Sequence, residues 1–270
     1  MRTQVGIVGA GPAGLMLGHL LHLAGIDSII IENRAQDYVI ERVRAGVLEQ
    51  GTVDLLIKSG VGARLEREGL LHDGIYFNVF GNRRRIDMAS LTGRRITVYG
   101  QNEVVKDLIA ARNTTGRPLR FEVSEVSVHD LESEQPKIRF AENDDPYEIR
   151  CDFIAGCDGF HGICRDSIPS KHLHIYERNY PFGWLGILAN ATPSSPELVY
   201  SLHERGFASS ACVRVTSPGC ICSVNRMKIS RCGLTIASGV NFSRGCRAMT
   251  AGNRTLDRLC KRASPACAAL

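Results

Sequence analysis

A glycine-rich turn near the start of the chain constrains its fold more than any other feature. Residues 9–14 read Gly-Ala-Gly-Pro-Ala-Gly and lie between an apolar segment, Gln4–Gly9, and a segment with helical periodicity, Pro12–Leu23. A second apolar segment, Ser28–Glu32, ends in an acid. In such a strand–helix–strand unit, the three glycines allow a tight turn, close approach of a pyrophosphate to the backbone, and close packing of helix on strand.

We therefore predict a dinucleotide site in a parallel βαβ unit, because the N-terminus of a helix offers unpaired N–H groups and a positive dipole to a pyrophosphate. Its expected residues are Gly9, Gly11 and Gly14 at the pyrophosphate and Glu32 at a ribose. The alternative is a glycine-rich turn without a ligand, which the combination of strand, helix and acid disfavours. The turn by itself does not distinguish FAD from NAD.

The remaining pattern predicts further helices and a change to strand periodicity. Helices are expected over Val47–Ser59, Gly62–Glu68 and Glu103–Arg112. Strands are expected over Gly74–Phe80 and Arg84–Met88 as a hairpin around Gly81-Asn82, over Ile96–Tyr99, over Arg120–His129, Lys137–Ala141 and Tyr147–Arg150 as an antiparallel group, and over Asp152–Gly156.

These elements predict an α/β fold in which a Rossmann-like βαβ domain is interrupted by a second, mostly β domain and then resumed. Residues 1–72 and 96–165 are assigned to the nucleotide-binding domain, and 73–95 and 166–210 to strands of the inserted domain. The inserted domain is expected to be incomplete at the C-terminal side. The apolar segment Ala13–Ile26 is too short and too amphipathic to span a membrane.

Two further stretches carry candidate binding residues. In Arg42–Gly51, two arginines at alternating positions point the same way if the segment is extended, and forked guanidinium groups bind phosphate. The alternative for this stretch is a solvated basic loop. In Cys157–Gly162, an Asp-Gly turn follows a strand, at the end where nucleotide-binding sheets hold ligands. His161 and Arg165 are spaced to share a helical face, although an Asp-Gly pair taken alone is simply a turn.

Residues 211–270 differ in composition from the rest of the chain. They hold ten Lys or Arg residues, one acid (Asp257) and seven of the ten cysteines, whereas residues 1–210 hold 23 basic and 27 acidic residues. Basic tails often contact nucleic acid, but such tails are seldom so rich in Cys and so poor in Lys. We expect no metal site here, since Cys220 and Cys222 are too close for a zinc knuckle and no CxxC pair accompanies them.

A shift of reading frame accounts for this aberrant, basic, Cys-rich tail. One permitted set of codons for Met227–Val240, read two bases later, encodes Glu-Asp-Leu-Glu-Met-Trp-Ser-Asp-Asp-Arg-Phe-Trp-Gly. Shifted reading of GC-rich codons also produces Arg, Cys, Ser, Ala and Gly. We therefore interpret the chain as frameshifted after about residue 208, in the gene or in its sequencing.

Up to about Ala208 the chain resembles the class A flavoprotein monooxygenases, and among them the 4-hydroxybenzoate hydroxylases. The motifs that carry the resemblance are GAGPAG (9–14), RVRAGVLEQG (42–51), VYGQ (98–101), IAGCDGFHG (154–162) and YPFGWLGILA (180–189). The sequence that the shifted frame encodes also resembles the acidic, tryptophan-containing stretch of full-length relatives.

The resemblance implies FAD as cofactor and NAD(P)H as reductant, and it assigns roles to individual positions. FAD contacts would come from Gly9, Gly11, Gly14, Glu32, Arg42, Val43, Arg44, Ala45, Gly46, Val47, Gln101 and Asp158, and NAD(P)H contacts from Arg34, Tyr38, His161 and Arg165, with Arg44 and Asp158 serving both. Tyr200 matches the tyrosine that hydrogen-bonds the substrate phenol and draws off its proton. Without the resemblance, Tyr200 would be read as a half-buried strand residue.

The chain departs from the family after Ala208. Where the family has a leucine, and then a Ser and an Arg that bind the substrate carboxylate, this chain has Ser209, Ala211 and Val213. Arg214 is out of register, and no role is carried onto it. The Gly-Asp motif that closes over the flavin, and the C-terminal helical part, are also absent.

The resulting prediction is an FAD-dependent monooxygenase of aromatic compound degradation that converts 4-hydroxybenzoate to 3,4-dihydroxybenzoate with NAD(P)H and O2. The chain as written is expected to be inactive or nearly so, and the full-length protein is expected to be cytoplasmic and a possible homodimer, with no nucleic acid or membrane partner. One alternative is a non-catalytic FAD- or NAD-binding module whose basic tail engages a partner. Another is a nicotinamide-dependent dehydrogenase.

Overall fold

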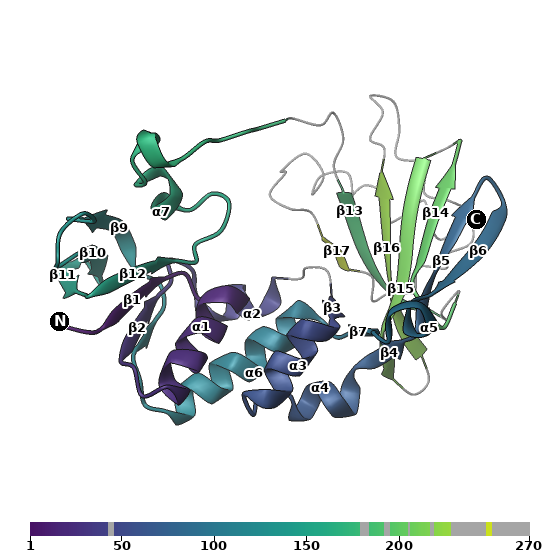
Figure 1. Ribbon diagram of the computed structural model, residues 1–270, viewed down its shortest axis with the longest axis horizontal. Coiled ribbons are helices and arrows are strands. Elements are labelled where there is room, and N and C mark those ends of the chain that lie inside the picture. Colours follow the sequence, from purple (N-terminus) through teal and green to yellow (C-terminus); the bar gives the residue numbers. More distant parts are fainter. Residues whose placement is uncertain are drawn as a thin grey trace. The chain divides into compact units, whose positions relative to one another are not determined.

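The fold was analysed in a computed structural model of the 270-residue chain (Figure 1). The structure describes residues 1–42, 46–178, 184–191, 195–204, 206–216, 219–227 and 247–249. The chain divides into two compact units. The first unit comprises residues 1–45, 54–65 and 100–177, and the second comprises 46–53, 66–99 and 178–270. Among the described residues, no helix is both long enough and apolar enough to cross a membrane.

The first unit contains the predicted parallel βαβ sheet. Its four strands lie in the order β12-β1-β2-β8, and all neighbours are parallel. Their bounds are β1 Val5–Val8, β2 Ser28–Ile31, β8 Leu119–Arg120 and β12 Phe153–Gly156. All residues of β2 are buried, as expected for a strand of a parallel sheet that is covered on both faces. Helices α1 (Pro12–Leu23) and α6 (Gln101–Thr114) pack against each other beside this sheet.

A three-stranded antiparallel sheet completes the first unit. It consists of β9 (Ser124–His129), β10 (Lys137–Glu142) and β11 (Asp145–Arg150), as predicted. The expected strand over 120–129 is broken at Glu122, whose φ of 59° is left-handed, so β8 joins the parallel sheet and β9 the antiparallel one. Buried residues of both sheets form one core, including Ile31, Ile138 and Ile149.

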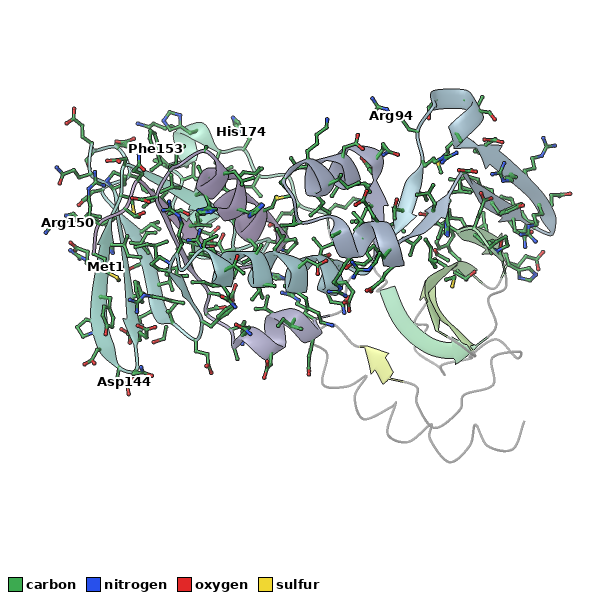
Figure 2. The ribbon with its side chains drawn as sticks, turned by 90° about the horizontal axis from the view of Figure 1, so that it is seen from below. Met1, Arg94, Asp144, Arg150, Phe153 and His174 are labelled. Carbon is green, nitrogen blue, oxygen red and sulfur yellow. The ribbon has the colours of Figure 1, made fainter. Side chains whose placement is uncertain are left out.

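Figure 2 shows side chains of the chain as sticks, and in this unit it labels Met1 and Arg150, close to the isolated bridge between Arg2 and Arg150. There the Met1 ammonium group donates to the Glu148 carbonyl at 2.7 Å. Phe153, on the outer strand β12, keeps 71% of its surface exposed.

The second unit is built around a seven-stranded sheet in the order β17-β13-β16-β15-β14-β5-β6. Its strands are β5 Gly74–Val79, β6 Asn82–Asp87, β13 Trp184–Ala191, β14 Val199–His203, β15 Gly206–Thr216, β16 Gly219–Met227 and β17 Arg247–Met249. Strand β14 pairs in parallel with β5 and antiparallel with β15. The backbone of β16 thus lies within the segment predicted to be an aberrant tail.

A small sheet in the order β3-β7-β4 also belongs to the second unit, with bounds Val47–Glu49, Ile96–Val98 and Leu70–His72. Pairing with β7 groups residues 46–53, 66–72 and 96–99 with the second unit, although the sequence placed them in the nucleotide-binding domain. Conversely, residues 166–177, which the sequence placed in the inserted domain, belong to the first unit. The helix expected from Val47 begins only at Gln50, because residues 47–49 pair as a strand instead.

The remaining helices are α2 Gln36–Glu41, α3 Gln50–Lys58, α4 Ala63–Glu68, α5 Met88–Thr92 and α7 Ile163–Asp166, with a 3₁₀ turn at Ser170–His172. Helix α2 had no sequence prediction. The β5–β6 hairpin is present, but its turn residues are Phe80 and Gly81, one position earlier than expected. Their φ angles of 48° and 86° are both positive, as a two-residue hairpin with a type I′ turn requires.

Candidate functional site

The glycine-rich turn between β1 and α1 has a geometry that only glycine permits at two positions. Gly9 has a φ of 106°, and a Cβ added there would lie 2.4 Å from the Cys157 carbonyl oxygen. A Cβ on Gly14 would lie 2.0 Å from the Gly9 carbonyl oxygen, where the helix packs against the strand end. Both distances are too short for any real contact, so these two glycines set the shape of the turn.

Gly11 has a different role, since a Cβ there would meet no atom within 4 Å. It is also the N-cap of the twelve-residue helix α1, and no side chain caps the N–H groups of the first turn. Open space in front of uncapped N–H groups at a helix N-terminus is the arrangement that holds a phosphate or pyrophosphate. The turn therefore fits the pyrophosphate of a dinucleotide.

Glu32 follows β2 and fixes the turn from the neighbouring strand. One carboxylate oxygen, Oε2, accepts the Ala10 N–H at 2.9 Å, and the other, Oε1, accepts the Arg34 N–H at 2.9 Å. An ionised carboxylate offers about four acceptor positions, so two remain for the hydroxyls of a ribose. Glu32 can thus hold the loop and a ribose at the same time.

A cavity of about 100 Å³ lies in front of this turn. Its lining brings together six of the residues predicted from the sequence, namely Gly11, Glu32, Arg34, Tyr38, Arg42 and Gln101, with Pro12, Val39 and Val105 between them. The Arg34 guanidinium carbon lies 5.3 Å from the centre of the Tyr38 ring, as in a cation–π contact. The cavity thus combines hydrogen-bond donors for phosphate, from the helix N-terminus and the arginines, with a carboxylate acceptor for ribose hydroxyls, which is the combination that an adenine dinucleotide needs.

The predicted Asp158 lies directly against the glycine-rich turn. A Cβ on Gly9 would come within 2.8 Å of the Asp158 backbone nitrogen. The Asp158 Oδ2 atom accepts the Cys164 N–H at 2.9 Å and so caps the start of α7, where Gly162 leaves room for the carboxylate. Burial, and then Asp158, raises the pKa of the Cys164 thiol to about 12, so this thiol stays protonated.

His161 and Arg165 do not share a helical face, contrary to the sequence prediction. Helix α7 begins only at Ile163, so His161 lies in the preceding turn. The two side chains are linked through Phe160, whose ring meets His161 edge-on at 4.9 Å and has the Arg165 guanidinium carbon 4.7 Å from its centre. Phe160 is 63% exposed, so this group faces solvent. Neither residue lines the cavity described above.

The arginine-containing stretch after Arg42 is only partly described. Val43, Arg44 and Ala45 lie outside the described residues. Gly46 is buried, and its carbonyl accepts the Tyr99 N–H at 2.7 Å, while Val47 pairs with Val98 in the β3–β7 ladder. Gly46 and Val47 belong to the second unit.

Tyr200 lies on β14, between two aromatic rings of the same sheet. Its ring centre is 5.6 Å from that of Phe77 on β5 and 5.9 Å from that of Phe207 on β15, both in stacked orientation. Tyr200 pairs with Ser209, so Ser209 and Ala211 share its face of the sheet. Both are buried. At the position where the resemblance implies a carboxylate-binding serine, this face therefore presents the methyl group of Ala211.

His72 belongs to the surroundings of Tyr200 and was missed by the sequence analysis. It is buried, and its Nδ1 atom accepts the Leu198 N–H at 3.1 Å, two residues before Tyr200. Its Nε2 atom has no hydrogen-bond partner among the described residues. Burial lowers the pKa of His72, and the nearby Glu197 opposes this effect. Since 126 positions separate His72 from Leu198, no local motif could have pointed to it.

Comparison with protein families matches residues 2–239 to the FAD binding domain family. The chain is 50% identical over 209 residues to p-hydroxybenzoate hydroxylase of Acinetobacter baylyi, which covers 77% of this chain and 52% of that protein. It is 29% identical over 161 residues to 12-dehydrotetracycline 5-monooxygenase/anhydrotetracycline 6-monooxygenase of Streptomyces rimosus, which covers 59% of this chain and 31% of that protein. The chain thus spans about half the length, or less, of the curated relatives it matches.

Solved structures show the same fold. PqsL of Pseudomonas aeruginosa, in complex with 2-aminobenzoylacetate, superposes with a TM-score of 0.70 at 17% identity, over 84% of this chain and 61% of that one. The p-nitrophenol 4-monooxygenase PnpA of Pseudomonas putida superposes with a TM-score of 0.65 at 15% identity, over 86% of this chain and 59% of that one. At these identities the likeness concerns the fold alone.

Proposed function

The chain belongs to the FAD binding domain family of flavin-dependent monooxygenases, and we propose that it is the front half of an enzyme that hydroxylates 4-hydroxybenzoate. The product would be 3,4-dihydroxybenzoate, made with NAD(P)H and O2. The observation that carries the proposal is the 50% identity over 209 residues to a protein named p-hydroxybenzoate hydroxylase. A non-catalytic binding module or a dehydrogenase that uses nicotinamide alone does not account for that identity.

FAD, when bound, carries electrons from NAD(P)H to O2 and so supplies the redox chemistry. The residues of the first unit hold it. Uncapped N–H groups at the start of α1, with open space at Gly11, would hold the pyrophosphate, and Glu32, which already accepts the Ala10 N–H, would accept hydrogen bonds from the ribose. The backbone of Gly9 and Gly14 keeps these groups in place, and Asp158 contacts the same turn.

NAD(P)H would be held by charged and aromatic side chains of the first unit. We assign this role to Arg34, Tyr38, His161 and Arg165, together with Arg44. Arg34 and Arg42 line one cavity and are the candidates for the 2′-phosphate that distinguishes NADPH from NADH. The Phe160 ring orders His161 and Arg165 on the surface, which supports a joint role for these two side chains.

Tyr200 is assigned to the substrate phenol. Its hydroxyl would hydrogen-bond the phenol oxygen and relay the phenol proton away, because an ionised phenol makes the adjacent ring carbon more nucleophilic. Phe77 and Phe207 stack beside the Tyr200 ring, with their planes 24° and 26° from its own.

We further propose that the 270-residue chain as written has little or no activity. It spans about half the length of its hydroxylase relative, and Ala211 cannot bind a carboxylate as a serine would. Apolar surface such as that of Phe153 also remains exposed. The full-length protein is proposed to be a cytoplasmic enzyme, with a homodimer as its possible assembly.

The test compares two purified proteins. One is the chain as written, and the other is a full-length protein in which the reading frame after residue 208 is restored to match the relatives. We expect the restored protein to be yellow, to hold FAD in a 1:1 ratio and to form 3,4-dihydroxybenzoate from 4-hydroxybenzoate with NAD(P)H. The chain as written should be poorly soluble and colourless. A restored protein that holds FAD but leaves 4-hydroxybenzoate unchanged would refute the proposed substrate.

A further inference from the structure

We propose that the ion pair between Arg85 and Glu197 is a positioning device that sets the register of strand β14 and thereby aims the Tyr200 hydroxyl. The inference rests on the proposed function of Tyr200 as the residue that contacts the phenol. It assigns a role to two residues that no motif singled out, since 112 positions separate them in the sequence. Neither residue is proposed to touch substrate or cofactor.

Arg85 and Glu197 form a bidentate ion pair. Arg85 Nε lies 2.7 Å from Glu197 Oε2, and Arg85 Nη2 lies 2.8 Å from Glu197 Oε1. The remaining guanidinium nitrogen, Arg85 Nη1, donates to Asp87 on the same strand at 2.9 Å, which fixes the guanidinium plane relative to β6. Two parallel hydrogen bonds define a direction as well as a distance, which a single contact does not.

Glu197 also engages the backbone at the start of β5. Its Oε1 atom accepts the Gly74 N–H at 2.8 Å, so one carboxylate joins the edge strand β6 to the first residue of β5. The Glu197 side chain is 13% exposed and the Arg85 side chain is 31% exposed. A surface ion pair held by one contact often contributes nothing measurable, but this pair is bidentate and its carboxylate also binds a backbone N–H.

The position of Glu197 makes it a register-setting residue for β14. The next residue, Leu198, is held on both sides of its peptide group: His72 Nδ1 accepts its N–H, and its carbonyl accepts the Tyr76 N–H at 2.9 Å. The ladder then places Tyr200 opposite Phe77. Because side chains alternate between faces, a slip of one residue would turn the Tyr200 side chain to the opposite face of the sheet.

The aromatic neighbours of Tyr200 do not set this register by themselves. Stacked rings are held by non-directional contacts and tolerate sliding, whereas the forked hydrogen bonds of Arg85 do not. Strand β14 has another unusual requirement, since it pairs in parallel with β5 and antiparallel with β15. A parallel partner cannot be set by a short hairpin. An anchor at the start of the strand, such as Glu197, supplies the missing constraint.

The experiment uses the full-length protein with its frame restored and four variants: Glu197→Gln, Arg85→Met, the double variant, and Arg95→Met. Arg95 is the matched control, because it loses an ion pair of similar length in the same unit, with Asp73 at 2.8 Å. Two quantities are measured for each protein. One is product formed per NAD(P)H oxidised, and the other is the Tyr200 ring resonance of ¹³C-tyrosine-labelled protein, assigned with Tyr200→Phe.

We expect Glu197→Gln and Arg85→Met to lower product per NAD(P)H by about tenfold or more, since misplacement by about 1 Å can cost a hundredfold in rate. The Tyr200 resonance should shift in both, while NAD(P)H oxidation stays within about twofold of the unmodified protein. The double variant should resemble the single ones, because partners in one contact are not additive. Arg95→Met should change neither quantity.

Unchanged product ratio and an unchanged Tyr200 resonance in Glu197→Gln would overturn the inference. If the unmodified protein forms no product at all, the proposed function fails, and the Tyr200 resonance alone decides whether the ion pair positions Tyr200. If Arg85→Met does not fold, Arg85→Lys replaces it, because lysine keeps the charge but cannot form the fork. A Lys variant with full coupling and an unshifted Tyr200 resonance would equally overturn the role of the fork.

Discussion

The cofactor cradle of the first unit and the Tyr200 site of the second are built from different parts of the chain. In the cradle the functional groups are mostly main chain: N–H groups at the start of α1, the bare backbone of Gly9 and Gly14, and one carboxylate that itself binds backbone N–H groups. Around Tyr200 they are side chains, contributed by β4, β5, β6, β14 and β15.

The difference teaches how each site can be damaged. A main-chain cradle fails when a side chain is added where none fits, because neighbouring backbone cannot move aside cheaply. A side-chain site fails when one hydrogen-bonding group is removed, because its partners remain buried and unpaired. We expect substitutions at the cradle to act on cofactor retention and folding, and substitutions around Tyr200 to act on the coupling of reduction to hydroxylation.

The largest effect is expected from Gly14→Ala in the frame-restored protein. The new methyl group would lie 2.0 Å from the Gly9 carbonyl oxygen, so helix α1 has to move away from the turn. Overpacking of this kind costs on the order of 3 kcal/mol or more, and FAD should be lost on gel filtration. Gly11→Ala is the matched control for folding, since its methyl group meets no protein atom. It should keep the same melting temperature yet bind FAD more weakly.

Tyr200→Phe should break the other site without disturbing the cradle. The variant keeps the stack with Phe77 and Phe207 but cannot accept or pass the phenol proton. General acid–base assistance is worth about 10²–10⁴ in rate, so NAD(P)H should still be oxidised while O2 is mostly converted to peroxide. The measurement is O2 consumed against 3,4-dihydroxybenzoate formed. Full coupling at an unchanged hydroxylation rate would reduce Tyr200 to a packing residue.

Glu32→Gln tests whether FAD binding depends on the Glu32 carboxylate. The amide nitrogen of glutamine cannot accept the N–H of Ala10 or Arg34, so one of the two backbone bonds is lost. An unsatisfied group of this kind costs about 1–3 kcal/mol, and FAD affinity, measured by titration of the apoprotein, should fall accordingly. Asp37→Asn, nearby on α2, serves as the control. Equal affinities for both variants would show that Glu32 is dispensable.

The smallest expected effect is a loss of stability around His72 at low pH. Burial lowers the pKa of His72, so the unfolded chain takes up a proton near pH 6.5 while folded His72 stays neutral. This contribution to stability is present above about pH 6.5 and is lost as the pH falls through the lowered pKa. Between pH 7 and 5, amide hydrogen exchange in β14 and β5 should therefore accelerate relative to that in β1 and β2.

His72→Asn keeps an acceptor for the Leu198 N–H but does not titrate, so its exchange rates in β14 should lose the additional acid sensitivity. At lower pH a second contribution follows. Arg85 holds the pKa of Glu197 below its usual range, and the stability gained from that pair is present above the usual range and lost on further acidification. Equal acid sensitivity of the two units in both proteins would contradict the assignment to His72.

The two regions also differed in how far they could be predicted from the sequence. The βαβ unit, the returning strand at Phe153, and Gly11 and Glu32 of the cavity followed from local patterns, because a glycine turn, a helix and a strand are all defined within a few residues of one another. The cavity residues Arg34, Tyr38 and Gln101 were expected only from the family resemblance. The prediction that His161 and Arg165 share a helical face was wrong, because α7 begins only at Ile163 and His161 lies in the turn before it. Asp158 accepts the Cys164 N–H at this helix start.

The second unit shows the limit of local patterns. Val47 begins a segment with helical periodicity, but the partner strand Ile96–Val98 draws its first residues into a sheet. The domain assignment of residues 46–53 and 66–72 shifts with it. Positive φ at Phe80 is another outcome that the hairpin imposes on a bulky residue against its own preference.

By itself, the sequence determined the glycine-rich turn that we assign to a dinucleotide, because that turn is made of backbone whose shape Gly9, Gly14 and Glu32 specify. It also determined the resemblance to an aromatic hydroxylase up to about Ala208. Only the tertiary structure decided that Arg85, Glu197 and His72 meet at the start of β14. Contacts between side chains more than a hundred positions apart depend on which strands become neighbours, and that is settled by the packing of the whole sheet.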